Sequence, residues 1–159
     1  MKLQMLSKSE EDTQKIAEVL AGLSQPGDVI TLSGDLGVGK TAFTKGFAKG
    51  LNIIEPITSP TFTIIKEYEG ELTLYHMDVY RLEFSEEDLG FDEYFYGDGV
   101  TIVEWAKFIE EFLPDTYLAI QIERLGETDR LLTIEAIGSR YEDLLEQVRR
   151  SPARSFLYE

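Results

Sequence analysis

One segment has the residue types and spacing to bind phosphate. Residues 34–41 read GDLGVGKT, which fits the pattern G-x-x-x-x-G-K-[ST]. Glycines at these positions let the backbone turn and point successive N–H groups, with those of a following helix N-terminus, at a phosphate group. In such loops the lysine reaches the β- and γ-phosphates, and the Ser or Thr hydroxyl binds Mg²⁺. The predicted nucleotide-binding residues are Gly34, Asp35, Leu36, Gly37, Val38, Gly39, Lys40 and Thr41.

Two acidic residues stand where predicted strands end. Asp78 follows the strand 72–77, and Glu104 follows the strand 100–103. Ligands of α/β sheets bind outside the carboxyl ends of the strands, so both acids are placed to meet the phosphates. Each can bind Mg²⁺ directly or through water while the other orients the attacking water, and the sequence leaves these roles open. A solvated loop acid is the competing interpretation for each.

Other polar residues near these strands carry weaker signals. Residues 58–61, TSPT, occupy the interval in which nucleotide hydrolases often carry a γ-phosphate-sensing switch, although a Ser/Thr turn before a strand explains them equally well. His76 is the only histidine, and we interpret it as a core or orienting residue rather than a catalyst. Trp105 and Tyr80 are interpreted as packing residues beside the acids.

The elements that position these residues form an α/β pattern. Strands are predicted at 3–6, 28–33 and 100–103, and hairpins at 61–68 with 72–77 and at 117–123 with 131–137. Helices are predicted after Ser9, over 41–50, over 105–112 and over 141–148, with short helical potential at 85–88. We expect a single-domain P-loop fold over residues 1–150, with a mixed parallel and antiparallel central sheet flanked by helices. Residues 151–159 are expected to be a frayed tail.

Composition narrows the class of protein. A length of 159 residues fits one domain with one core. The chain has 15 Lys+Arg against 30 Asp+Glu, a net charge of −15, which disfavours broad binding to nucleic acid or to an anionic membrane. It has no cysteine, and we find no apolar N-terminal segment and no apolar run of membrane-spanning length. We therefore expect a cytoplasmic protein that does not bind nucleic acid broadly and does not dock on membranes.

Three classes of nucleotide-binding protein fit poorly. A GTPase normally carries N/T-K-x-D, and no lysine here has an aspartate two residues later. A small-molecule kinase normally has an arginine-rich lid, whereas arginine is sparse in this chain. A motor ATPase is normally larger and supplies an arginine finger to a neighbour. The class that remains is a minimal ATPase with no evident domain for a second substrate.

Together with the phosphate loop, four further motifs resemble the bacterial TsaE (YjeE) family of P-loop ATPases, which are needed to make threonylcarbamoyladenosine in tRNA. These motifs are SPTF at 59–62, HMDVYRL at 76–82, LGFDE at 89–93 and Glu104-Trp105, and the resemblance covers about residues 1–150. It implies a mixed α/β sheet, ATP or ADP with Mg²⁺ as cofactors, and a TsaD–TsaB complex as partner.

The resemblance also implies roles for single residues. Lys40 and Thr41 match the phosphate and Mg²⁺ ligands, and Asp78 matches the Walker-B-like acid. Glu104 matches the acid near the metal and the attacking water, and Thr61 matches the switch threonine. The adenine is expected between Glu10 and Gly126.

The sequence therefore predicts slow ATP hydrolysis that the partner completes, because no arginine stands out as a catalytic finger. A nucleotide-gated binding module with incidental hydrolysis is one alternative. A small P-loop kinase is another.

Overall fold

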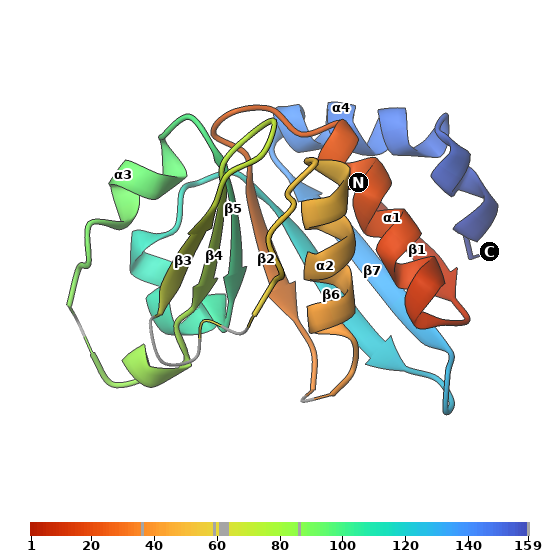
Figure 1. Cartoon of the computed structure of the whole chain (residues 1–159), viewed down its shortest axis with the longest axis horizontal. Helices are drawn as coiled ribbons and strands as arrows, with labels where there is room; N and C mark the ends of the chain where they lie inside the picture. The colour runs from red at the N-terminus through yellow and green to blue at the C-terminus, as the bar shows by residue number, and fades with distance from the viewer. Residues whose placement is uncertain (36, 59, 61–63, 86, 159) are drawn as a thin grey trace.

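The computed structural model describes residues 1–35, 37–58, 60, 64–85 and 87–158 (Figure 1). Within them, seven strands form one sheet in the order β1-β7-β6-β2-β5-β4-β3. The strands are β1 (Lys2–Ser7), β2 (Val29–Ser33), β3 (Ile65–Tyr68), β4 (Leu74–Asp78), β5 (Val100–Glu104), β6 (Tyr117–Arg124) and β7 (Arg130–Ile137). The neighbours β6, β2, β5 and β4 run parallel, while β1, β7 and β3 pair antiparallel. The predicted mixed α/β fold and both predicted hairpins are confirmed.

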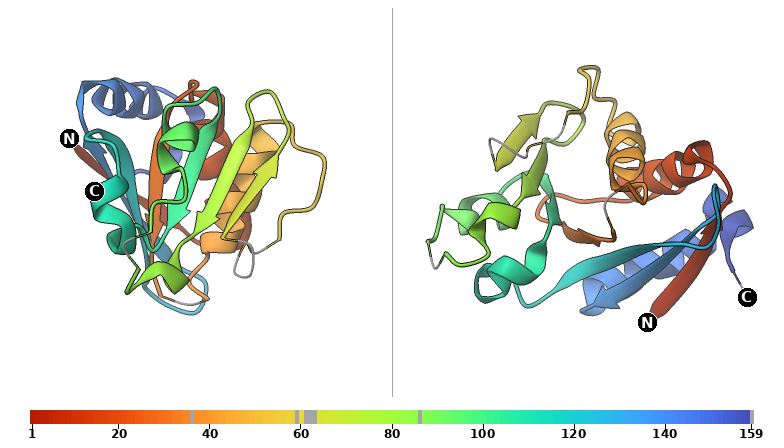
Figure 2. Two further views of the ribbon diagram at one scale, coloured as in Figure 1. Left: turned by 90° about the vertical axis from the view of Figure 1, so that its left-hand side faces the viewer. Right: turned by 90° about the horizontal axis from the view of Figure 1, so that it is seen from below.

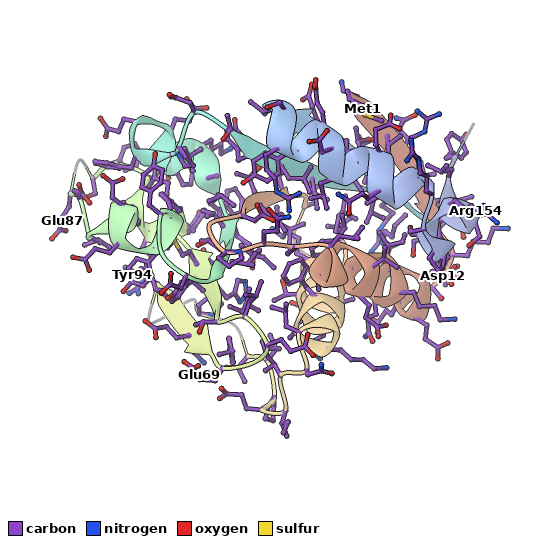
Figure 3. All side chains as sticks on the ribbon, turned by 90° about the horizontal axis from the view of Figure 1, so that it is seen from above. Met1, Asp12, Glu69, Glu87, Tyr94 and Arg154 are labelled. Atoms are coloured by element: carbon purple, nitrogen blue, oxygen red, sulfur yellow. The ribbon has the colours of Figure 1, made fainter. Side chains whose placement is uncertain are left out.

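Helices cover the sheet from two sides (Figure 2). The elements are α1 (Glu10–Gly22), α2 (Lys40–Gly50), α3 (Phe91–Phe95), α4 (Ser139–Arg149) and the 3₁₀ helices η1 (Tyr80–Leu82), η2 (Ala106–Phe112) and η3 (Pro152–Phe156). α1 and α2 lie side by side on one face, and α3, η1 and η2 cover β4 and β5 on the other. α4 crosses the end of the sheet opposite the phosphate loop (Figures 1 and 3). No described helix is long and apolar enough to cross a membrane.

Alternation along the strands produces two cores. Ile102 of β5 faces the α1–α2 side, where Phe43 and Phe47 are fully buried. Val103, the next residue, joins Phe91 and other apolar residues under α3 and η2. Successive strand residues point to opposite faces, so one strand serves both cores. The central strands are thereby held between helices with their carboxyl ends open at one edge.

Close packing of α2 on α1 sets the position of the phosphate loop. A Cβ atom at Gly46 would overlap the backbone of Gln14 in α1, and one at Gly50 would lie 2.7 Å from Ala21 Cβ. These glycines therefore let the two helix backbones approach closely. Because the loop leads directly into α2, this contact holds the loop against the ends of the strands.

Two predicted helical segments differ from the structure. The described residues of 85–88 are not helical, and α3 begins only at Phe91. Asp88 Oδ1 accepts hydrogen bonds from the N–H groups of Gly90 and Phe91, and Ser85 Oγ accepts one from Glu87 N–H. Such bonds to nearby backbone compete with helix formation. The predicted helix at 105–112 is a 3₁₀ segment with a kink at Ile109.

The expectation of a frayed tail is wrong for the described residues after Arg150. They form η3, whose Ala153 is buried. Leu157 makes a β-bridge with Met5, and Tyr158 N–H donates to Gln4 O at 2.9 Å. β1 lies at the edge of the sheet, where unpaired backbone groups favour an added strand. The tail covers part of that edge, an outcome that composition alone does not signal.

Candidate nucleotide site

The phosphate loop has the backbone geometry that the motif predicts. Gly37 and Gly39 have φ values of 77° and 122°, in the region that favours glycine. Val38 N–H donates to Asp35 O at 3.2 Å and closes the turn, and α2 begins immediately afterwards at Lys40. The space beside Gly37 and Gly39 is open. The N–H groups at the start of α2 thus adjoin free space in which a phosphate group fits.

An arginine that the sequence reasoning missed anchors this loop. Arg130, at the start of β7, donates from Nε to Val38 O at 2.8 Å. Its Nη1 donates to the carbonyl oxygens of Gly126, Glu127 and Asp129. One guanidinium therefore ties the phosphate loop to the β6–β7 turn. No local pattern predicts this contact, because Arg130 and Val38 are 92 residues apart.

The two predicted acids are brought together with the loop. Asp78 and Glu104 are the last residues of β4 and β5 and are direct partners in the parallel ladder. With Lys40 and Thr41 they line a cavity of about 330 Å³. The other lining residues are Glu10, Gly37, Gly39, Ala42, Thr44, Ile57, Thr58, His76 and Trp105. Parallel pairing places both carboxylates at the same edge of the sheet, as their positions in sequence predict.

Glu104 is held from two sides. Its Oε2 lies 2.7 Å from His76 Nε2, and its Oε1 lies 3.7 Å from Lys40 Nζ. The Glu104 side chain is 12% exposed and that of Lys40 is 11% exposed. Asp78 Oδ1 instead accepts from Tyr80 N–H at 3.1 Å. The two neighbouring acids therefore have different surroundings. Glu104 lies between an imidazole and an ammonium group, whereas Asp78 accepts a hydrogen bond from a backbone N–H group.

Trp105 forms a wall beside Lys40. Lys40 Nζ lies 5.0 Å from the centre of its ring, and Lys107 Nζ lies 5.3 Å from it. Tyr80 packs edge-on against the same ring at 4.9 Å, and Phe108 stacks at 5.8 Å. The expectation that Trp105 and Tyr80 pack beside the acids is confirmed. In this structure the Lys40 ammonium rests between a carboxylate and an aromatic face, both of which attract a cation.

A second cavity adjoins the first, and Lys40 and Trp105 line both of them. Its volume is about 370 Å³, and its walls come from β2, β6 and η2. Gly34 and Asp35 line this second cavity rather than the one containing Thr41. Lys40 lines both of these cavities, whereas Gly34 and Asp35 line only the second of them.

The expected adenine region contains a third cavity, of about 260 Å³. Glu10 lines both this cavity and the one beside Lys40. Gly126 does not line it, whereas its neighbours Glu127 and Thr128 do. Gly126 contributes a carbonyl oxygen to Arg130 instead. The cavity is thus walled by the start of α1, the phosphate loop and the β6–β7 turn.

Two predicted site residues lie outside the described residues, namely Leu36 and Thr61. Thr58, from the same predicted switch segment as Thr61, lines the cavity beside Lys40. Its N–H donates to the Tyr68 hydroxyl at 3.2 Å. The described part of that segment therefore reaches the phosphate loop.

The donor set suits a nucleotide phosphate and a hard cation. Backbone N–H groups and one lysine supply positive charge, and Thr41, Asp78 and Glu104 supply oxygen ligands of the kind that Mg²⁺ prefers. No preformed group of three metal-binding side chains occurs within the described ranges. Mg²⁺ is usually bound through one or two protein oxygens together with substrate phosphates, so this arrangement fits the ion.

Comparisons with known proteins agree with these motifs. Residues 7–132 match the family model described as threonylcarbamoyl adenosine biosynthesis protein TsaE. A relative from Bacillus subtilis strain 168, "tRNA threonylcarbamoyladenosine biosynthesis protein TsaE", is 59% identical over 88% of this chain and 89% of its own. A relative of the same name from Treponema pallidum is 43% identical over 83% of this chain and 99% of its own.

A solved structure shows the same fold. The crystal structure of YdiB from Bacillus subtilis superposes with a TM-score of 0.84 and 51% sequence identity, covering 94% of this chain and 95% of that one. The family match spans the phosphate loop, both acids and His76. On the strength of the family model, the relatives and the shared fold, the chain belongs to the TsaE family.

Proposed function

We propose that this protein binds and hydrolyses ATP as an accessory subunit of tRNA threonylcarbamoyladenosine synthesis. The observation that carries the proposal is the convergence of Asp78 and Glu104 with Lys40 and Thr41 on one cavity. A phosphate loop with acids at the ends of neighbouring strands is the arrangement used for in-line attack of water on a γ-phosphate. The names of the relatives supply the pathway.

Each residue has a role in this proposal. Lys40 leaves Glu104 and Trp105 to contact the β- and γ-phosphates, and the N–H groups at the start of α2 bind them. Thr41 and one of the acids hold Mg²⁺, which neutralises the charge of the phosphates when it is bound. Glu104 orients the attacking water through the oxygen that Lys40 vacates. Asp78 then holds the metal or its waters.

The base and the switch segment complete the site. We place the adenine in the cavity between α1 and the β6–β7 turn, beside Glu10 and next to the turn that contains Gly126. Thr61 is proposed as the residue that senses the γ-phosphate, on the resemblance of its motif. Thr58, three residues earlier, supports this proposal because it lines the same cavity as Lys40.

A partner is proposed to complete the hydrolytic site. No arginine of the described chain lines the cavity beside Lys40 and Thr41. A missing arginine finger typically lowers the hydrolysis rate by several orders of magnitude. We therefore propose slow hydrolysis by the isolated protein and faster hydrolysis with a TsaD–TsaB-like complex, on which the tRNA chemistry takes place.

Glu104→Gln tests this proposal. The amide keeps the shape of the side chain but is a poor base and metal ligand, so ATP should still bind while hydrolysis with the partner complex falls by about 10²–10⁴-fold. Phosphate release measures hydrolysis, and titration of tryptophan emission measures binding. Glu111→Gln, an exposed acid of η2, is the matched control and should retain activity. Full activity of Glu104→Gln would exclude Glu104 from the mechanism.

A second candidate function is a nucleotide-gated binding module. It is favoured by the second cavity, which shares Lys40 and Trp105 with the first and therefore changes shape when nucleotide moves Lys40. Under this proposal the Glu104→Gln variant sustains multiple rounds of tRNA modification without hydrolysis. Under the ATPase proposal it stalls modification after the first round.

A further inference from the structure

Among the described residues, the side chain of His76 makes one hydrogen bond, and its partner is Glu104. His76 lies on β4, its side chain is 4% exposed, and its Nε2 is 2.7 Å from Glu104 Oε2. It also lines the cavity that contains Lys40 and Thr41. A buried histidine whose side chain bonds to this carboxylate, and to no other group of the described residues, is placed to determine how the carboxylate points.

The other ring nitrogen decides which way the hydrogen bond runs. His76 Nδ1 is buried and has no hydrogen-bond partner among the described residues. A proton on Nδ1 would leave a buried donor unpaired and would set the lone pair of Nε2 against a carboxylate oxygen, both of which are unfavourable. The proton therefore belongs on Nε2, and His76 donates to Glu104.

The two carboxylate oxygens of Glu104 consequently have different partners. Oε2 is bound to His76, and Oε1 faces Lys40 at 3.7 Å. When a nucleotide draws Lys40 away, Oε1 loses its neighbour while Oε2 keeps its own. The carboxylate then stays in place, with one free oxygen directed into the cavity.

We propose that His76 is a positioning residue, which donates from Nε2 to hold Glu104 in place after Lys40 has moved to the phosphates. The effect of this hydrogen bond on ATP turnover rests on the proposed ATPase function. The existence of the hydrogen bond is independent of that function. A buried histidine that only fills space is the alternative, and the two differ in which substitutions the site tolerates.

Two amides of different length test the proposal by kinetics. In His76→Gln the side-chain nitrogen is as many bonds from Cβ as Nε2 and can donate to Glu104, whereas in His76→Asn it matches Nδ1 and falls short. We expect His76→Gln to retain most of kcat and His76→Asn to lose about 10–100-fold, as for other residues that orient site ligands. Nucleotide affinity should change by less than about twofold in both, because the His76 side chain is bonded to Glu104 and not to Lys40 or Thr41, the proposed phosphate and Mg²⁺ ligands.

Nuclear magnetic resonance tests the hydrogen bond without any activity. Since the chain has one histidine, ¹⁵N-histidine labelling gives an unambiguous imidazole spectrum of the nucleotide-free protein. We expect a proton on Nε2, a bare Nδ1, and a changed Nε2–H signal in Glu104→Ala but not in Glu111→Ala. A proton on Nδ1, or a spectrum unaffected by Glu104→Ala, would overturn the proposal.

The two experiments separate failure of this inference from failure of the ATPase proposal. If the wild-type protein with its partner complex releases no phosphate, the ATPase proposal fails and the resonance spectrum still decides the hydrogen bond. If His76→Asn hydrolyses ATP at the wild-type rate, His76 does not position Glu104 and the ATPase proposal stands. Equal losses in both amide variants would also overturn the positioning role, because Gln preserves the donor. The spectrum of the wild-type protein remains decisive if His76→Asn does not fold.

Discussion

At the scale of single residues, Trp105 combines backbone strain with a position beside the loop lysine. Its φ of 63° lies in the left-handed region, which is unfavourable for a bulky side chain. Such strain costs about 1–3 kcal/mol and persists only where surrounding contacts hold it. Here those contacts are the rings of Tyr80 and Phe108 and the ammonium groups of Lys40 and Lys107.

The emission of Trp105 should report nucleotide binding. It is the only tryptophan, and Lys40 Nζ lies 5.0 Å from its ring centre. Movement of this ammonium to the phosphates changes the electric field at the indole, so saturating ADP or ATP should change its fluorescence. Lys107→Gln should keep the response, because Lys107 lines the other cavity, whereas Lys40→Ala should lose it. Unchanged emission of the wild-type protein at saturation would contradict the shared placement of Trp105 and the nucleotide.

For single residues, the sequence predicts the members of the candidate site wherever their chemistry depends on the spacing of near neighbours. The loop motif predicted Gly37, Gly39, Lys40 and Thr41 at one site, and the structure brings them to one cavity. The contact of Glu104 with His76 was not predictable. His76 is 28 residues away from Glu104, and their contact depends on the register of β4 against β5.

At the scale of elements, the site depends on how closely α2 approaches α1. Gly46 and Gly50 stand one turn apart, so they present one small surface to the other helix. Their lack of side chains, rather than any helical preference, allows the contact. The sequence predicted both helices but not this function of the two glycines.

Gly46→Ala should destabilise the protein. An added methyl group overlaps the Gln14 backbone, which cannot rotate away, and overpacking of this kind costs about 1–3 kcal/mol. Urea denaturation followed by circular dichroism measures the free energy of unfolding. Gly22→Ala is the matched control, because the space around Gly22 is open and alanine favours a helix over glycine. Equal stability of both variants would show that α1 and α2 separate without cost.

At the scale of the whole molecule, the net charge of −15 determines which kinds of partner the protein attracts or repels. Acidic side chains such as Glu69 and Glu87 project from the periphery (Figure 3). This field repels the phosphate backbone of tRNA, whereas the nucleotide that we propose for the phosphate loop would be held locally, by N–H groups and Lys40. The relatives are named for a tRNA modification, so the charge disfavours direct tRNA contact by this chain without excluding a role in the pathway.

Stability at alkaline pH should depend on Tyr141. This residue of α4 accepts a hydrogen bond from Val29 N–H of β2 at 2.9 Å. Burial raises its pKa above the usual 10.0, the charge of Asp28 adds to the rise, and the bond from Val29 opposes it. The unfolded chain therefore loses this proton first, so the contribution of Tyr141 is complete below pH 10 and is lost as the pH rises through the folded pKa.

Tyr141→Phe isolates this contribution. At pH 8 the variant should be less stable by about 1–3 kcal/mol, because Val29 N–H loses its acceptor. The difference from wild type should shrink above pH 10, and urea denaturation at several pH values measures it. General charge repulsion and other tyrosines affect both proteins and cancel in the difference. Tyr158→Phe, at an exposed ring, is the control, and a gap that does not change with pH would contradict the raised pKa.

Local sequence patterns specify the helices and strands and the types of residue that form the candidate site. Hydrophobic periodicity and turn residues act between near neighbours, so they identified β2, α2 and both hairpins, and they placed Asp78 and Glu104 where strands end. Where several local outcomes compete, as at residues 85–88, local side-chain hydrogen bonds prevailed over helical preference.

Contacts between residues far apart in the sequence depend instead on how the whole chain packs. Strand order and register, set by burial in two cores, brought His76 to Glu104 and Asp78 beside it. The same folding brought Arg130 to the phosphate loop and the tail to the free edge of β1. Such contacts join residues tens of positions apart. Their geometry follows from the packing of the whole sheet, which no local pattern records.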